Sequence, residues 1–107
     1  MSGPRVAPAD IEANIASEWY FTGAEAVGQG NERQPPVPSG HPLQLLTFCV
    51  LVLRNGFTVT GESACVSHAN FDAQKGREIA RGDAFDKIWP LMGYALKENL
   101  HYNRPLL

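Results

Sequence analysis

Six side chains of the sequence combine the residue types that bind a small, negatively charged ligand with an aromatic base. Aromatic rings stack on bases, an amide hydrogen-bonds them, and arginine or lysine meets phosphate. The six candidates are Arg54, Phe57, Asn70, Phe71, Arg77 and Lys87. A plainer interpretation also fits, in which the two phenylalanines fill the core and the basic side chains form a solvated helix face. The residue types alone do not choose between the two interpretations.

Groups that could carry out catalysis are sparse. Cys65 lies shortly before His68, but a nucleophilic cysteine also needs a group that orients its base, and none is evident. No second carboxylate is placed to pair with Glu62, which favours a structural or ligand-binding role over acid–base work. We therefore expect a protein that is not an enzyme. A small hydrolase that uses Glu62 or Cys65 is the minor alternative.

The sequence predicts neither a metal site nor a cofactor. The three histidines are scattered and no CxxC pair is present. Cys49 and Cys65 lie in strand-like segments and are expected to be buried free thiols in a reducing cytoplasm. Asn70 and Asp72 precede a predicted helix, whose first backbone N–H groups can receive a phosphate, although the Asp72 carboxylate would compete with an anion.

Length and charge restrict the classes of protein. The chain of 107 residues has room for one domain, residues 1–107, and its net charge of −2 argues against a binder of nucleic-acid polymers. The longest apolar run, Leu45 to Leu53, is too short to cross a bilayer, so we expect no membrane partner. Residues 73–107 carry a net positive charge in spite of the overall sign, which suits a small anion.

These side chains must be positioned by a small α+β fold. The spacing of Ile11, Ile15 and Trp19 predicts an N-terminal helix over residues 7–20. The stretch 28–42 is rich in proline and glycine and predicts a loop or linker. Strands are predicted over residues 45–54 and 57–66, joined by a two-residue type I′ turn at Asn55-Gly56, with a third strand as a possible extension.

The predicted hairpin also sets a register and raises a packing question. A two-residue turn pairs Arg54 with Phe57 and places Cys49 opposite Glu62. The first strand is apolar on both faces, so either each face receives a helix or one face is a subunit interface, and we favour the interface. A long helix is predicted from Asp72 to about residue 100, with a kink or break at Pro90.

Small residues mark one face of this long helix. Gly76, Ala80 and Ala84 recur at every fourth position and Ile88 continues the row. Side chains this small let another backbone approach closely. We therefore expect the backbone of another element to lie close to this face.

Residues 46–96 resemble a family of small phage and prophage proteins in several motifs that occur in the same order. A strand ends in Asn-Gly-Phe, a GESAC-like strand follows, and an Asn-Phe-Asp segment precedes a helix with a glycine- and alanine-rich face. Lys-Ile-Trp and Gly-Tyr come later in that helix. The matching residues are Asn55–Phe57, Gly61–Cys65, Asn70–Asp72, Gly76, Ala80, Ala84, Lys87–Trp89 and Gly93–Tyr94.

The family includes the first type of Thoeris anti-defence proteins, and this resemblance implies a function. Those proteins are sponges that bind cyclic ADP-ribose isomers made by bacterial TIR-domain proteins. Some relatives bind cyclic oligonucleotides, and they assemble as dimers or hexamers. The resemblance implies a sponge that acts in the host cytoplasm, holds its cyclic nucleotide without degrading it, and forms a homo-oligomer. This chain departs from the family at Gly82-Asp83, where a polar pair closer to Glu-Asn is expected, and at Met92, where an acidic residue is common.

Within the matched motifs, a role can be assigned to each candidate. Phe57 or Phe71 would stack on the adenine, and Asn70 would hydrogen-bond the base or ribose. The pyrophosphate would be met by Arg54, Arg77 and Lys87. The alternative function is a phage accessory protein that docks on a host or virion protein through the apolar strand face.

Overall fold

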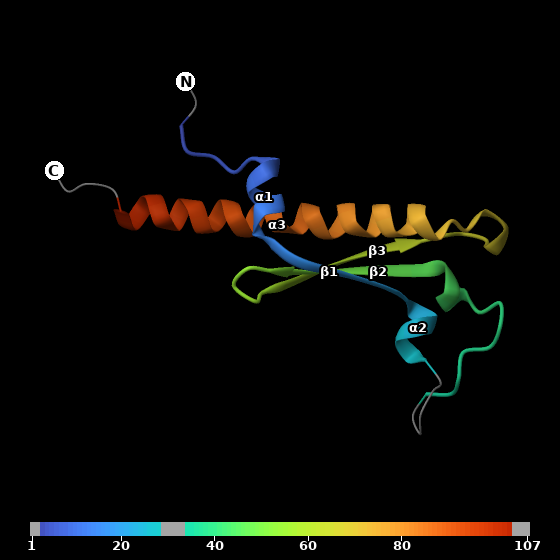
Figure 1. Ribbon diagram of the computed structural model, residues 1–107. Coiled ribbons are helices and arrows are strands. Elements are labelled where there is room, and N and C mark those ends of the chain that lie inside the picture. The colour runs from blue at the N-terminus through green and yellow to red at the C-terminus, as the bar shows by residue number, and fades with distance from the viewer. Residues whose placement is uncertain (1–2, 29–33, 104–107) are drawn as a thin grey trace.

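An antiparallel sheet of three strands lies against one long helix (Figure 1). The computed structural model describes residues 3–28 and 34–103. Its elements, in chain order, are α1 (Pro8–Asn14), β1 (Ile15–Thr22), α2 (Gly23–Val27), the 3₁₀ turn η1 (Pro42–Leu45), β2 (Leu46–Leu53), β3 (Thr58–Ala64), the 3₁₀ turn η2 (His68–Asn70) and α3 (Ala73–Asn103). The strands follow the order β1-β2-β3. The predicted α+β class is confirmed, and the extra strand exists.

That extra strand comes from the segment predicted as a helix. The helix ends at Asn14, and the chain continues as β1, which pairs antiparallel with β2. The prediction of a helix to Tyr20 was wrong because the sequence after Asn14 is dominated by aromatic and β-branched residues, which favour a strand. β2 also needs a second neighbour, since a two-stranded hairpin is marginal by itself.

The β2–β3 hairpin has a different turn from the predicted one. The Leu53 N–H donates to the Phe57 carbonyl over 2.8 Å, and the Gly56 N–H donates to the Leu53 carbonyl over 2.9 Å. The loop therefore has three residues, and of these only Gly56 has a positive φ, +89°. This is a type I turn closed by a glycine bulge, which places one positive φ where a type I′ turn needs two.

The longer turn shifts the register by one residue. Glu62 pairs with Phe48, and Cys49 pairs with Gly61, so the prediction that placed Cys49 opposite Glu62 was wrong. Because side chains alternate along a strand, the shift moves Glu62 to the other face of the sheet. Gly61 and Val59 instead face α3.

Close packing of α3 on β3 explains the row of small residues. Gly76, Ala80, Ala84 and Ile88 are the buried residues of α3, as predicted. A Cβ built on Gly61 would lie 2.1 Å from the Ala80 carbonyl oxygen. The strand and helix backbones therefore touch directly. Ile11, Leu51 and Leu53 complete the core beside them.

Pro90 does not end the helix. α3 runs as one assigned helix through Pro90 to Asn103, and Figure 1 shows a single rod without a sharp bend. The prediction of a kink or break was wrong. The carbonyl that loses its partner belongs to Asp86, an exposed residue, so water can satisfy it.

Only one face of the sheet is covered by helix α3. The opposite face, called the outer face here, presents side chains from all three strands. Its apolar members include a stacked pair, Phe21 and Phe48, with ring centroids 5.3 Å apart, and Trp19, which is 61% exposed. Of the described helices, only the short α2 lies on that side, at the end of β1, so the predicted solution in which a helix covers each face is not found among the described residues.

The proline-rich segment is a connection between α2 and η1. Residues 34–41 have no helix or strand, which agrees with the predicted loop, while the N-terminal part of that loop, 29–33, lies outside the described residues. Pro42 begins η1 instead of ending the loop. Within the described ranges, no helix has the length and apolar character needed to span a membrane.

Candidate ligand-binding site

The first turns of α3 bring together three of the six candidate residues. Asn70 ends η2, Phe71 follows it, and Arg77 lies in the second turn of α3. Lys75 joins them from the first turn, although sequence reasoning missed it. The sequence did contain a signal for Lys75: it follows the helix-capping Asp72 by three residues, which places a basic side chain in the first turn of the helix.

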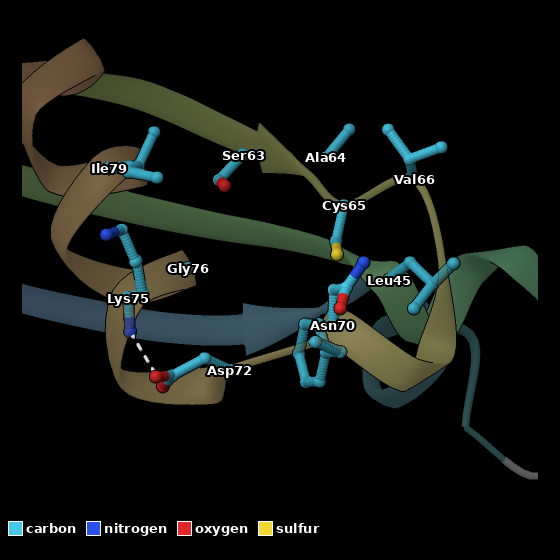
Figure 2. A pocket seen from close by; sticks show the side chains of 11 residues that line it. Leu45, Ser63, Ala64, Cys65, Val66, Asn70, Asp72, Lys75, Gly76 and Ile79 are labelled. Atoms are coloured by element: carbon cyan, nitrogen blue, oxygen red, sulfur yellow. Dashed lines mark hydrogen bonds between the residues drawn. The ribbon is translucent and has the colours of Figure 1, made fainter.

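Two cavities meet at the Phe71 ring. The first has a volume of about 280 Å³ and is lined by Asn70, Phe71 and Lys75 together with the end of β3. Figure 2 shows the Asn70 amide facing the Cys65 sulfur across this cavity, while the Lys75 side chain extends away from Asp72. The second cavity, of about 350 Å³, is lined by Phe71 and Arg77. Each cavity is at or below the small end of the range of about 300–1,000 Å³ that is typical of ligand pockets.

Two cations at this site are free to meet an anion. The Arg77 guanidinium donates to the Gln74 side chain over 3.1 Å, and neither Arg77 nor Lys75 has an ion pair within the part of the chain described. The helix terminus itself is partly occupied, because an Asp72 carboxylate oxygen accepts from the Lys75 N–H over 3.1 Å. Anion binding would therefore depend on the side chains more than on the first backbone N–H groups.

Thr47 lines the second cavity and carries an unusual hydroxyl. It is 3% exposed, and its Oγ1 has no hydrogen-bond partner among the described residues. A Cβ built on Gly76 would lie 2.9 Å from this oxygen, so the hydroxyl sits against the α3 backbone. The sequence signal for this buried hydroxyl was that Thr47 is a single polar residue inside the apolar run of β2. A buried hydroxyl without a partner destabilises the fold.

Arg54 and Phe57 lie at the other end of the sheet. Arg54 anchors the end of α1, because its Nε donates to the Ala13 carbonyl. Phe57 is 55% exposed beside the hairpin loop. They line two neighbouring cavities that share Asn14, Met92 and Ala95. The structure therefore divides five of the six candidates between two ends of the molecule, and the sixth, Lys87, lies between them.

Lys87 protects the free edge of β3. Its Nζ donates to the Thr60 carbonyl over 2.6 Å, and the Glu62 N–H donates to an Asp83 carboxylate oxygen over 3.0 Å. Lys87 and Asp83 also form an ion pair at 3.9 Å. Their side chains occupy backbone groups that a further strand would otherwise use. This arrangement gives both residues a structural role at the edge of the sheet.

A charged network fastens α1 and β1 to α3. Arg81 donates to both carboxylate oxygens of Glu12, at 3.0 and 2.9 Å, and to Glu18 at 3.2–3.3 Å. Hydrogen bonds from Arg81 and Tyr20 hold the pKa of Glu18 below its ordinary value of 4.5. Burial, with the hydrogen bond to Glu18, raises the pKa of Tyr20. Sequence patterns gave no sign of this network.

The candidate catalytic groups have other contacts. The Cys65 Sγ donates to the Ser67 carbonyl over 3.2 Å, and the His68 Nε2 lies 3.0 Å from the Gly40 carbonyl. Cys49 and Cys65 are both free thiols, as predicted, but Cys65 is only half-buried. Burial raises the pKa of the Cys49 thiol, which disfavours the thiolate.

The family model described as phage protein (N4 Gp49/phage Sf6 gene 66) matches residues 6–100. No curated protein gives a match. No solved structure gives a match either.

Proposed function

Because the chain belongs to the phage protein (N4 Gp49/phage Sf6 gene 66) family, we propose that it is an anti-defence sponge. It binds a cyclic ADP-ribose-type or cyclic oligonucleotide immune signal and keeps it from the defence effector in the host cytoplasm. The signal is held and not degraded. One observation carries this proposal: Phe71 lines two cavities together with Asn70 and two cations, Lys75 and Arg77, that form no ion pair among the described residues.

The chemistry of this cluster matches such a signal. The Phe71 ring offers a face for the base, and the Asn70 amide can both donate to and accept from a base or ribose. Lys75 and Arg77 supply positive charge for the pyrophosphate. Arg54, Phe57 and Lys87 are left out of the proposed site on this chain, because the structure places them elsewhere.

The size of the cavities bears on assembly. Each cavity is small beside the pockets that enclose drug-sized ligands, so one copy would hold only part of the signal. A homo-oligomer, dimer or hexamer, would let another copy cover the rest. A sponge must also bind tightly, with a binding free energy of about −8 to −12 kcal/mol for micromolar to nanomolar signals.

A thermal-shift panel tests the proposal. Cyclic ADP-ribose isomers and cyclic oligonucleotides are each added to the full chain, and at least one should raise Tm. The bound nucleotide, recovered after denaturation, should have its original mass and retention time. A cleaved product would indicate an enzyme, and a panel without any shift would rule out the sponge.

The outer face supports a second candidate function. Trp19 of β1 is exposed there, the outer apolar side chains of β2 are half-buried, and α3 covers none of them, while exposed apolar patches often mark protein–protein contacts. On this alternative, the protein is an accessory factor that docks on a host or virion protein. A stoichiometric partner that is lost in Val50→Lys, combined with no nucleotide binding, would favour it.

A further inference from the structure

The two edge strands of the sheet, β1 and β3, differ in whether side chains cover their outward backbone groups. β3 is covered by Asp83 and Lys87 of α3, which occupy the Glu62 N–H and the Thr60 carbonyl. β1 forms the opposite edge. Proteins usually blunt an exposed strand edge with charges, bulges or short strands, because open backbone groups recruit another strand. An edge left open beside one that is covered therefore indicates a docking site.

The register identifies the open groups on β1. The Leu53–Phe57 hydrogen bond directs the odd-numbered residues of β2 toward β3, so its even-numbered residues face β1. Their partners on β1 are odd-numbered, which leaves the backbone groups of Glu18, Tyr20 and Thr22 pointing outward. The Thr22 N–H is taken by the Glu25 carboxylate at 2.8 Å. No hydrogen bond is found for the outward groups of Glu18 and Tyr20 among the described residues.

We propose that the β1 edge pairs with β1 of a second copy, antiparallel, around a two-fold axis at Trp19. In this register, Glu18 and Tyr20 of the second copy form a hydrogen-bonded pair of residues. By symmetry, Tyr20 forms the same pair with Glu18 of the second copy. Four backbone hydrogen bonds result. The two Trp19 rings face each other in the close, non-hydrogen-bonded position between the couples. Each Trp19 residue is 61% exposed in the single chain, so the contact removes apolar surface from water.

The other symmetric registers are worse. An axis at Glu18 places two carboxylates directly opposite each other, which is destabilising. An axis at Tyr20 pairs Glu18 with Thr22, whose N–H already donates to Glu25. A register shifted by a single residue aligns outward groups with inward ones and forms no ladder. The sequence of β1 therefore complements itself in one alignment.

Neither helix that flanks β1 blocks this pairing. Figure 1 shows α1 on the same side of the sheet as α3, whereas α2 lies on the other side at the opposite end of β1. In the antiparallel arrangement, α1 of one copy comes near α2 of the other, and the two lie on different faces. The result is one continuous six-stranded sheet, and its two ends are the β3 edges that α3 already covers.

Site-directed cross-linking tests the interface. Trp19→Cys is placed in a Cys65→Ser background, so that the introduced thiol and the buried Cys49 remain. Paired Cα atoms at a non-hydrogen-bonded position are about 4.5 Å apart, within the range of a disulfide. Mild oxidation should therefore give a covalent dimer on a non-reducing gel. Ser17→Cys in the same background is the matched control. It should give no covalent dimer on the gel, because the residue opposite Ser17 in the second copy is Phe21.

Solution mass provides a second, independent readout. Sedimentation equilibrium should show a dimer for the full chain and for Val52→Lys, which lies on the outer face of the central strand. Trp19→Lys should give a monomer with an unchanged far-UV spectrum. A dimer that Val52→Lys breaks and Trp19→Lys spares would mean that the sheets pack face to face, which overturns the edge interface.

The interface rests on the proposed function only in its homo-oligomer part. Failure of the interface can therefore be distinguished from failure of the proposed nucleotide binding. A monomeric full chain overturns both the edge pairing and the proposed homo-oligomer. A dimer that cross-links at Ser17 and not at Trp19 overturns the edge pairing alone. Nucleotide binding is measured separately, and its loss or retention does not decide the interface.

Discussion

Replacing Gly61 by alanine should push α3 away from β3 and destabilise the fold. The new Cβ would lie 2.1 Å from the Ala80 carbonyl oxygen and 2.3 Å from the Ala84 nitrogen. Both obstacles are backbone atoms, so no side-chain rotation can relieve the overlap. The helix must move by roughly 1 Å, and this would loosen the packing of the small-residue row on β3.

The magnitude follows from overpacking data. Extra atoms in a packed core destabilise by about 1–3 kcal/mol, occasionally more, and a backbone obstacle places Gly61→Ala at or above the upper end. Against a total stability of about 5–15 kcal/mol, a loss of about 3 kcal/mol is large. It corresponds to a decrease in Tm of roughly 12–24 °C for a domain of this size.

Gly82→Ala is the matched control for this prediction. Gly82 belongs to the same helix, and a Cβ there meets nothing within 4 Å. This variant should gain about 1 kcal/mol from helix propensity. Urea unfolding followed by circular dichroism measures both variants. A free energy of unfolding for Gly61→Ala within about 0.5 kcal/mol of wild type would refute the direct backbone contact.

Other contacts give further predictions. Glu18→Gln should lower the free energy of unfolding by about 1 kcal/mol at neutral pH. Because Arg81 lowers the pKa of Glu18 in the folded state, this contribution is present above pH 4.5 and is lost as the pH falls through the lower folded value, so acid titration should bring variant and wild type together. Thr47→Val should increase stability by about 1 kcal/mol in urea unfolding, since it removes a buried hydroxyl without a partner; a decrease would show that the hydroxyl has one. The double variant Asp83→Ala with Lys87→Ala uncovers the β3 edge, and sedimentation velocity should detect assemblies larger than those of wild type.

The sequence was sufficient for the elements whose patterns have one interpretation. Gly76, Ala80 and Ala84 predicted a close approach because no other structure requires small residues at every fourth position, and the helix met the β3 backbone there. The apolar run of β2 predicted a strand, and β2 is the central strand of the sheet. The candidate residues Asn70, Phe71 and Arg77 are near one another in sequence, so their proximity depended on a local turn only.

Other features depended on long-range pairing that no local pattern reveals. Ile11, Ile15 and Trp19 fit a helical period, but pairing with β2 made a strand of the segment after Asn14. Asn55-Gly56 fits two turns, and the choice between them depends on which residues of β2 must face α3. That choice fixed Glu62 on the outer face.

The candidate site shows the same division. Lys87 has the residue type of an anion ligand, but its ammonium reaches the Thr60 carbonyl, which lies far away in sequence. Arg54 is likewise occupied, because its Nε donates to the Ala13 carbonyl in α1. The predicted helix over residues 7–20 placed no helix end there, so the sequence did not indicate this contact. Residue type predicts what a side chain can bind, and only the fold decides which groups remain free.

Calorimetric titration of wild type and Phe71→Ala with the nucleotide that gives the largest thermal shift tests the central claim most directly. Base stacking contributes about 1–3 kcal/mol, so we expect saturable binding by wild type and roughly a 5- to 150-fold weaker affinity for Phe71→Ala. Phe57→Ala, at the other end of the sheet, should bind like wild type. Equal affinities for wild type and Phe71→Ala, or a loss confined to Phe57→Ala, would contradict the placement of the ligand at the start of α3.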